Sequence, residues 1–144
     1  MERQSHLEIV YADNSIDAQY MKVMENGLNE LAKVKKGLDA TKSFSFACFD
    51  NDKNFVAGVD GKSFYGCLYV DTLWVSENFR GQNYGTLLMA KVEEVARERN
   101  CKFMTLFTTD WQARPFYEKL GFKLEFIRSG YAKDSEVYYL RKDL

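Results

Sequence analysis

The spacing of apolar residues along the chain predicts an alternation of strands and helices. The apolar run from Leu7 to Ala12 predicts a short strand. In the segment that follows, apolar side chains recur every three or four residues, which is the period of a helix with one apolar face. This stripe consists of Ile16, Tyr20, Val23, Met24, Leu28, Leu31 and Val34. Asn14 or Ser15 can cap the start of this helix, and Gly37 can end it.

The next segments have strand patterns. Ser43 to Phe49 places apolar side chains at alternate positions, and Phe55 to Val59 follows after a polar turn, so the two predict a hairpin. Gly66 to Val75 is apolar on both faces and predicts a central strand that is covered on both sides.

A helix is expected after this strand, because Leu88, Val92, Val95 and Ala96 share one face. Asn100 can end that helix in the left-handed conformation. Lys102 to Thr108 predicts the next strand, which lies parallel to the central strand after a right-handed crossover.

The rest of the chain predicts a short helix and a final strand pair. Asp110 to Leu120 is the short helix; Pro115 fits its first turn and Gly121 ends it. Phe122 to Arg128 and Glu136 to Arg141 predict a closing antiparallel pair. The whole pattern indicates one domain, residues 1–144, of the α/β (α+β) class. It would have a mixed, mostly antiparallel sheet of six or seven strands and helices on both faces.

Composition narrows the function classes. The chain is 46% apolar and has a net charge of −1, which is typical of a globular protein and lacks the basic excess of a nucleic-acid binder. No signal peptide and no membrane span are recognisable, so we expect a cytoplasmic protein with no membrane partner. Cys48, Cys67 and Cys101 lie in apolar runs and are expected in the core of a protein from a reducing compartment. His6 is the only histidine, and we expect no metal.

The segment from Arg80 to Thr86 has the features of an anion site. It follows the central strand, contains Gly81 and Gly85, and leads directly into a helix whose first amides have no partner inside the helix. Such amides and the helix dipole bind phosphate. The spacing matches neither a Walker loop nor a dinucleotide fingerprint. From the loop alone, a phosphate site and an ordinary turn that starts a helix are equally open.

Two segments together are similar to the GNAT superfamily of acyl-CoA-dependent N-acyltransferases. Arg80 to Gly85 resembles the family signature Gln/Arg-x-x-Gly-x-Gly/Ala, with Asn83 at the position of the first signature glycine. Asn tolerates the left-handed conformation better than most residues, so the turn is expected to persist. Ala113 to Phe122 resembles the family's Ala-x-x-Phe-Tyr-x-x-x-Gly-Phe segment. The resemblance covers Asp71 to Phe122 well and implies a GNAT-type sheet with a splayed parallel strand pair.

The resemblance implies acetyl-CoA as cosubstrate. Its pantetheine arm would enter between the splayed strands, and the loop amides would hold its pyrophosphate. Asp110 stands where relatives often carry an asparagine that contacts the cofactor. The cofactor-binding residues implied in this way are Leu73, Trp74, Val75, Arg80, Gly81, Gln82, Asn83, Tyr84, Gly85, Thr86, Asp110 and Phe116.

Acyl transfer to an amine by direct attack needs a neutral amine, a donor for the oxyanion and a proton for the departing thiolate. Tyr117 matches the family tyrosine that protonates the sulfur; otherwise it is a packed aromatic residue. Asp71 lies near the sequence position at which many members of the family carry a glutamate as general base. A carboxylate in an apolar strand needs a partner or a function, so it is either that base or hydrogen-bonded to a loop.

The expected function is transfer of an acetyl group to a primary amine of a small molecule, peptide or protein. Two alternatives are a non-catalytic acyl-CoA sensor and an aminoacyl-tRNA-acetylating toxin; the nearly neutral charge disfavours the toxin. The sequence does not determine which acceptor the protein uses or whether the chain forms a homodimer. The aromatic C-terminal part, with Tyr131, Tyr138 and Tyr139, fits either an acceptor site or a dimer contact.

Overall fold

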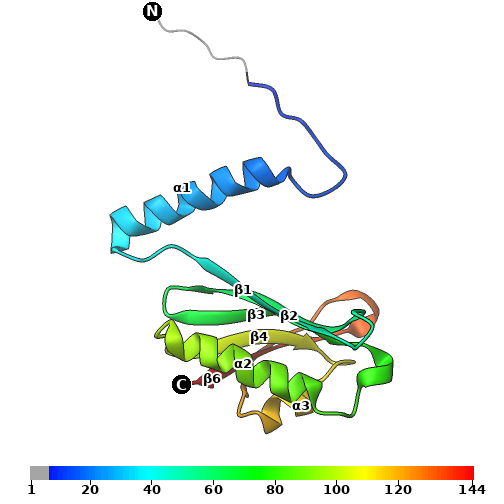
Figure 1. Ribbon diagram of the computed structural model, residues 1–144. Coiled ribbons are helices and arrows are strands. Elements are labelled where there is room, and N and C mark those ends of the chain that lie inside the picture. Colours follow the sequence, from blue (N-terminus) through cyan, green and yellow to red (C-terminus); the bar gives the residue numbers. More distant parts are fainter. Residues whose placement is uncertain (1–6) are drawn as a thin grey trace, which may run out of the picture. The chain divides into compact units, whose positions relative to one another are not determined.

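The computed structural model describes residues 7–144, and the chain forms two compact units that divide between Leu38 and Asp39 (Figure 1). His6 lies outside the described residues, so the expectation that rests on it is not examined by the structure.

The N-terminal unit consists of one helix and the segment before it. Helix α1 runs from Ala18 to Lys36. The predicted cap at Asn14 or Ser15 is wrong, because the Asp17 carboxylate accepts a hydrogen bond from the Gln19 amide at 3.1 Å. Gly37 ends the helix as predicted, with a φ of 67°.

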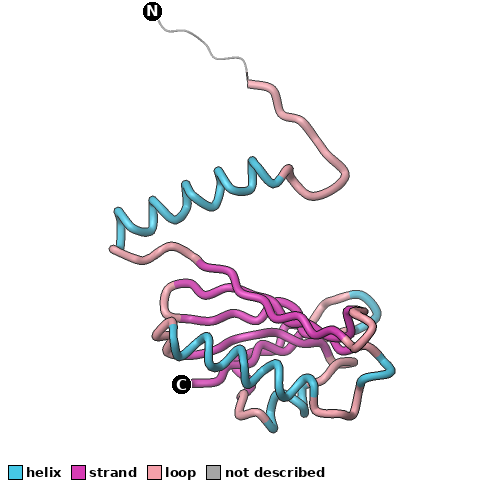
Figure 2. The backbone as a smooth tube through the Cα atoms, in the orientation of Figure 1, coloured by secondary structure: helices cyan, strands magenta, loops and turns pink. Residues whose placement is uncertain are grey.

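The predicted strand at Leu7 to Ala12 is also wrong. The segment is an exposed loop (Figure 2), since a strand needs a hydrogen-bonded neighbour and none pairs with it among the described residues. The α1 stripe has the predicted period, but none of its side chains is buried in the structure, and Leu28 is 64% exposed.

The second unit contains a six-stranded sheet, which confirms the predicted mixed α/β class. The strand order is β1-β2-β3-β4-β6-β5. The bounds are β1 Lys42–Phe49, β2 Phe55–Phe64, β3 Cys67–Val75, β4 Phe103–Thr109, β5 Lys123–Arg128 and β6 Val137–Asp143. Among the described pairs of neighbouring strands only β3 and β4 are parallel.

Helix α2, Tyr84–Glu98, connects the two parallel strands, and the short helix α3, Arg114–Lys119, follows β4. Two 3-10 turns that were not predicted, Glu77–Phe79 and Ala132–Asp134, lie in the connections. Asn100 has a φ of 57° directly after α2, as expected for a left-handed helix end.

Both α-helices of this unit lie on the same face of the sheet (Figure 1). The core between them and the sheet includes Leu68, Val92, Met104 and Leu140, each less than 2% exposed. The opposite face is open within this unit, where Trp74 is 46% exposed. Strand β3 is therefore central, but within this unit it is covered on one face only. Its outer face carries polar and aromatic side chains, and the helices of this unit leave that face uncovered.

The parallel strands diverge along their length. They pair only from Cys67 opposite Phe103 to Tyr69 opposite Thr105, although β3 continues to Val75 and β4 to Thr109. This separation is the splayed pair that the sequence resemblance implied. Backbone groups along the second half of β3 therefore face a gap instead of a neighbouring strand.

Candidate active site

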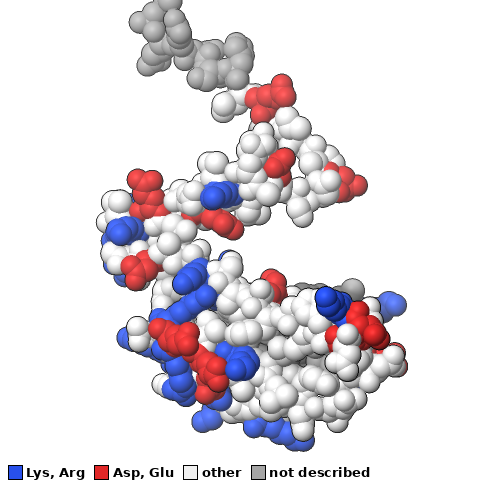
Figure 3. Space-filling model, viewed as in Figure 1, with Lys and Arg blue, Asp and Glu red and all other residues white. Residues whose placement is uncertain are grey.

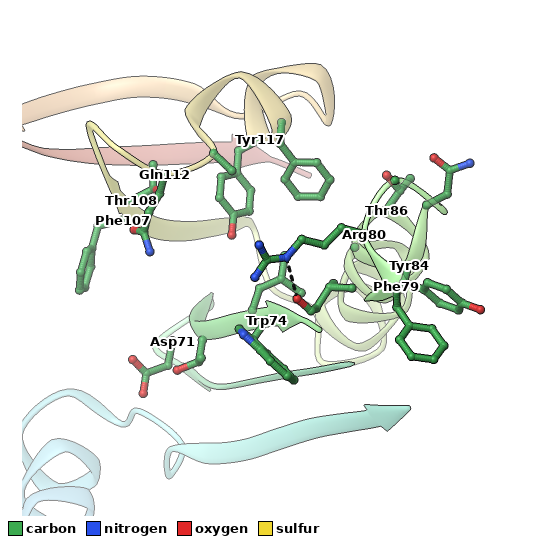
Figure 4. Close-up of a pocket in the computed structure, with 18 residues that line it drawn as sticks. Asp71, Trp74, Phe79, Arg80, Tyr84, Thr86, Phe107, Thr108, Gln112 and Tyr117 are labelled. Carbon is green, nitrogen blue, oxygen red and sulfur yellow. Dashed lines mark hydrogen bonds between the residues drawn. The ribbon is translucent and has the colours of Figure 1, made fainter. Parts of the chain in front are cut away.

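A cavity of about 720 Å³ lies where the two parallel strands separate (Figure 4). Its volume is in the range of small-molecule and cofactor sites. The walls come from β3, the connection to α2, the end of β4 and α3. The lining residues are Asp71, Thr72, Leu73, Trp74, Val75, Phe79, Arg80, Gly81, Asn83, Tyr84, Gly85, Thr86, Phe107, Thr108, Gln112, Ala113, Phe116 and Tyr117.

The loop before α2 has the geometry of an anion site. Gly81 and Asn83 both have left-handed backbones, with φ of 77° and 66°. Asn83 thus holds the turn at the position of the signature glycine, as expected from its tolerance of this conformation. The first α2 amide that donates to a backbone carbonyl is Leu87, to Asn83 at 3.0 Å. In the described part of the chain, the amides of residues 81–86 donate no hydrogen bond, so they and the helix dipole are available to an anion.

Two contacts fix this loop against the rest of the site. The Arg80 Nε donates to the Val75 carbonyl at 3.0 Å, so Arg80 ties the loop to the end of β3 (Figure 4). Gly85, in the first turn of α2, packs against α3. A Cβ at this position would lie 3.2 Å from Phe116 Cζ, so the close approach of the two helices depends on glycine.

Asp71 occupies a β-bulge. Along the β2–β3 pair, Asp60 is opposite Thr72 and Gly61 is opposite Val70, so Asp71 is the extra residue without a partner. A bulge turns a side chain away from the regular alternation of a strand. The Asp71 carboxylate is exposed and lines the cavity (Figure 4). The alternative of a carboxylate satisfied by a loop has no support, because no hydrogen bond to Asp71 occurs among the described residues.

Tyr117 enters the cavity from the opposite wall. Its ring packs edge-on against Phe116 and Phe122, with centroids 5.0 and 5.9 Å apart, and its hydroxyl group points into the cavity (Figure 4). Burial raises the pKa of the phenol above its ordinary value, so Tyr117 keeps its proton at neutral pH. Tyr117 therefore packs as an aromatic residue through its ring and still presents its hydroxyl group to the cavity.

Most of the residues predicted for the site line this cavity; Gln82 and Asp110 do not. The Gln82 side chain donates weakly through Nε2 to the Asn78 carbonyl at 3.5 Å. The Asp110 carboxylate accepts from the Glu136 amide at 3.3 Å and so joins the end of β4 to the loop before β6. Asp110 thus has a structural partner away from the cavity.

Several lining residues were missed by sequence reasoning, among them Phe107, Thr108 and Gln112. Gln112 Oε1 accepts from the Thr109 hydroxyl at 2.8 Å and from the Thr109 amide at 3.2 Å. This contact closes the end of β4 where it leaves the sheet. A Thr-Thr pair at a strand end, followed by a glutamine three residues later, was the available signal, but such patterns are common in ordinary turns.

The cysteines are not part of the site. Cys67 and Cys101 are buried, and Cys48 is partly buried. Burial raises the pKa of the Cys67 thiol to about 11, which makes it a poor nucleophile at neutral pH. The expectation that Cys67 and Cys101 belong to the core is confirmed.

The arrangement of loop, splayed strands and tyrosine can be compared with known proteins. The profile of the acetyltransferase (GNAT) family matches residues 13–122. The chain belongs to the GNAT acetyltransferase family. An acetyltransferase from Agrobacterium fabrum is 30% identical over 106 residues, which is 74% of this chain and 77% of the relative. Blasticidin-S acetyltransferase from Streptomyces morookaense is 32% identical over 101 residues, 69% of this chain and 74% of that protein.

The fold agrees with this membership. The crystal structure of a protein from Agrobacterium tumefaciens assigned to the acetyltransferases has a TM-score of 0.81 and 26% identity, and the match covers 96% of this chain and 100% of the other. This GNAT chain is accordingly an acyltransferase, and the cavity between its splayed strands is its candidate active site.

Three further findings concern charge, membrane-spanning helices and metal ligands in the GNAT chain. Lysine and arginine side chains are interspersed with aspartate and glutamate on the visible face of the unit Asp39–Leu144 (Figure 3). No described helix is long and apolar enough to span a membrane. The described residues also contain no group of three His, Cys, Asp or Glu side chains that could hold a metal ion.

Proposed function

We propose that this protein transfers the acetyl group of acetyl-CoA to a primary amine of a small molecule, with Tyr117 as general acid and Asp71 as general base. The observation that carries the proposal is that Asp71 and Tyr117 line one cavity that ends at unpaired amides. The name of the Streptomyces relative gives a small molecule as its acceptor, which supports a small-molecule amine here.

The donor end of the cavity fits the parts of acetyl-CoA. The unpaired amides of residues 81–86 and the dipole of α2 suit a pyrophosphate. The second half of β3 has no hydrogen-bonded neighbour on the side of β4, so its backbone can pair with the amide groups of a pantetheine arm. The thioester would then lie between β3 and Tyr117.

The chemistry follows from the two titratable side chains. Asp71 takes a proton from the amine, directly or through a water molecule, as the nitrogen attacks the thioester carbon. A bond forms from that nitrogen to the acyl carbon, and the bond from the carbon to sulfur breaks. Tyr117 gives its proton to the departing sulfur. Asp71 then releases its proton to solvent and Tyr117 regains one from it, so both side chains return to their starting states. The products are the N-acetylated amine and free CoA, so charge and atoms balance.

The test is a steady-state assay of thiol release from acetyl-CoA over a panel of amines, together with calorimetry of acetyl-CoA binding. For Tyr117→Phe we expect kcat to fall by ~10²-fold or more, the usual size of general acid catalysis, while binding of acetyl-CoA is kept. Tyr138→Phe is the matched control. Tyr138 is also a partly buried tyrosine, but it contacts Arg114 and does not line the cavity.

The possible outcomes separate the hypotheses. Binding of acetyl-CoA without turnover of any amine would favour a sensor module over an enzyme. No binding at millimolar acetyl-CoA would overturn the proposed donor site itself. A kcat of Tyr117→Phe equal to that of the native chain, with chemistry rate-limiting, would remove Tyr117 as the acid.

A further inference from the structure

Beyond the cavity, four aromatic rings form a continuous row on the open face of the sheet. Tyr69, Phe107, Tyr139 and Phe126 come from β3, β4, β6 and β5, which are consecutive strands in the sheet. Neighbouring ring centroids are 6.3, 5.7 and 5.6 Å apart. Phe107 is 47% exposed and Phe126 is 50% exposed, so within the unit Asp39–Leu144 the row presents an aromatic surface that no other element of that unit covers.

Groups of opposite charge lie toward the two sides of the row. On the side of β3 and β4, Phe107, the second ring, lines the cavity together with Asp71. At the far end, the Arg128 guanidinium lies 5.6 Å from the ring centroids of both Phe126 and Tyr139. Arg128 forms no ion pair among the described residues, and its side chain is exposed. The row thus leads from a carboxylate beside the candidate thioester position to a cation without a carboxylate partner.

We propose that this aromatic row is the acceptor subsite, and that the acceptor is a flat, aromatic amine with an anionic group at the end remote from the amine. This inference rests on the proposed function, because it places the amine beside Asp71. The flat body would stack over Phe107 and Tyr139, since aromatic rings gain from offset or edge contacts at such distances. The anion would meet Arg128, whose planar guanidinium binds carboxylate or phosphate in a bidentate manner.

The size of the acceptor follows from the same distances. Phe107 and Tyr139 are 5.7 Å apart, and Arg128 lies 5.6 Å from Tyr139. These distances are of the size of a single aromatic ring with a substituent at each end, so an amine and an anion separated by one aromatic ring are the first acceptors to test. A flexible aliphatic amine of the same length would lose more conformational entropy on binding and would gain no ring contact.

The test uses three matched amines in the thiol-release assay with acetyl-CoA: para-aminomethylbenzoate, para-methylbenzylamine and trans-aminomethylcyclohexane carboxylate. The second lacks the anion, and the third lacks the aromatic ring. Rates are compared at equal concentrations of neutral amine. We expect kcat/KM to be highest for para-aminomethylbenzoate, by about 10-fold over each of the others, as one charged hydrogen-bonded pair or one ring contact can supply.

Variants assign the preference to the proposed residues. Arg128→Gln is expected to remove the preference for the carboxylate over the methyl compound, with the larger fall in kcat/KM for para-aminomethylbenzoate. Tyr139→Leu is expected to reduce the preference for the aromatic compound over the cyclohexane. Arg141→Gln is the control, because Arg141 lies on the same face of the sheet but contacts Phe103 at 3.8 Å and pairs with Asp143 at 2.8 Å.

Two results would overturn this inference and leave the proposed function intact. One is turnover of amines with no preference among the three compounds. The other is an Arg128→Gln variant that keeps the native preference for the carboxylate. A failure of the proposed function looks different, because no amine would release thiol from acetyl-CoA.

Discussion

Gly85 and Phe116 are so close that a Cβ on the glycine would lie 3.2 Å from the ring. The contact joins the first turn of α2, which carries the amides of the candidate phosphate site, to α3, which carries Tyr117. The donor loop and the proposed acid are therefore held together by a position that has no room for a side chain.

We predict that Gly85→Ala raises the KM for acetyl-CoA by about 10-fold, because the added methyl group displaces either Phe116 or the start of α2 by a few tenths of an ångström. Steady-state kinetics with acetyl-CoA as the varied substrate measure this effect. Gly27→Ala is the control, since a Cβ at Gly27 meets no atom within 4 Å. If Gly85→Ala has the KM of the native chain, the contact between Gly85 and Phe116 is not needed to hold the acetyl-CoA loop in place.

The proposed acid predicts the pH dependence of kcat. A proton donor acts in its protonated form, and burial raises the pKa of Tyr117 above its ordinary value. The loss of activity with increasing pH should therefore begin only above about pH 10. The measurement is a pH profile of kcat at saturating concentrations of both substrates. A basic limb below about pH 9 that persists in other buffers would argue for a different donor.

A partly buried ion pair between α2 and β6 predicts an effect on stability. Lys142 Nζ lies 2.6 Å from Glu93 Oε1, and this hydrogen bond lowers the pKa of Glu93, with Arg97 contributing less. Because the pKa of Glu93 is lower in the folded state, its ion pair stabilises the fold at pH values above the ordinary carboxylate pKa. This contribution is lost as the pH falls through the pKa of Glu93 in the folded protein.

We expect Glu93→Gln to reduce the free energy of unfolding by about 1 kcal/mol at pH 7 and by much less near pH 3. Urea denaturation at the two pH values measures the difference. Glu94→Gln is a suitable control at pH 7, because Glu94 is 65% exposed and its partner Lys91 is 3.8 Å away. An equal loss for Glu93→Gln at both pH values would show that packing, rather than charge, is responsible.

Arg99 connects the end of α2 to the first two strands. Its guanidinium donates to the Lys42 carbonyl at 2.8 Å, to the Ser43 carbonyl at 3.0 Å and to the Ser63 hydroxyl at 3.1 Å. Arg99→Met keeps the aliphatic stem and removes these donors. We predict a loss of about 2 kcal/mol in the free energy of unfolding, as expected for hydrogen bonds to a charged group.

Thermal or urea unfolding provides the measurement for Arg99→Met. The comparison variant is Arg97→Met, because Arg97 is 58% exposed and pairs within its own helix with Glu93. If Arg99→Met loses no more free energy of unfolding than Arg97→Met, the three hydrogen bonds of Arg99 contribute no net stability beyond the hydrogen bonds to water that they replace.

Local patterns were sufficient for the loop and for most of the elements. Asn83 and Gly81 adopt left-handed backbones because their side chains permit it, and the amides that follow are free because every helix begins with unpaired donors. The same reasoning failed at Leu7 to Ala12, where an apolar run has no strand beside it. It also missed that Asp110 would bind the loop before β6, because that loop is distant in sequence.

The sequence by itself determined the family, the order of the elements after Leu38, the glycine-containing loop before α2 and the short helix that carries Tyr117, since these depend on backbone preferences and short spacings. Only the tertiary structure decided that Asp71 is a bulge residue that lines the cavity and that Tyr139 joins an aromatic row while Tyr138 packs on the other face. The physical reason is that strand register and neighbour order arise from pairing between distant segments. A shift of one residue in that pairing reverses the face on which each side chain lies.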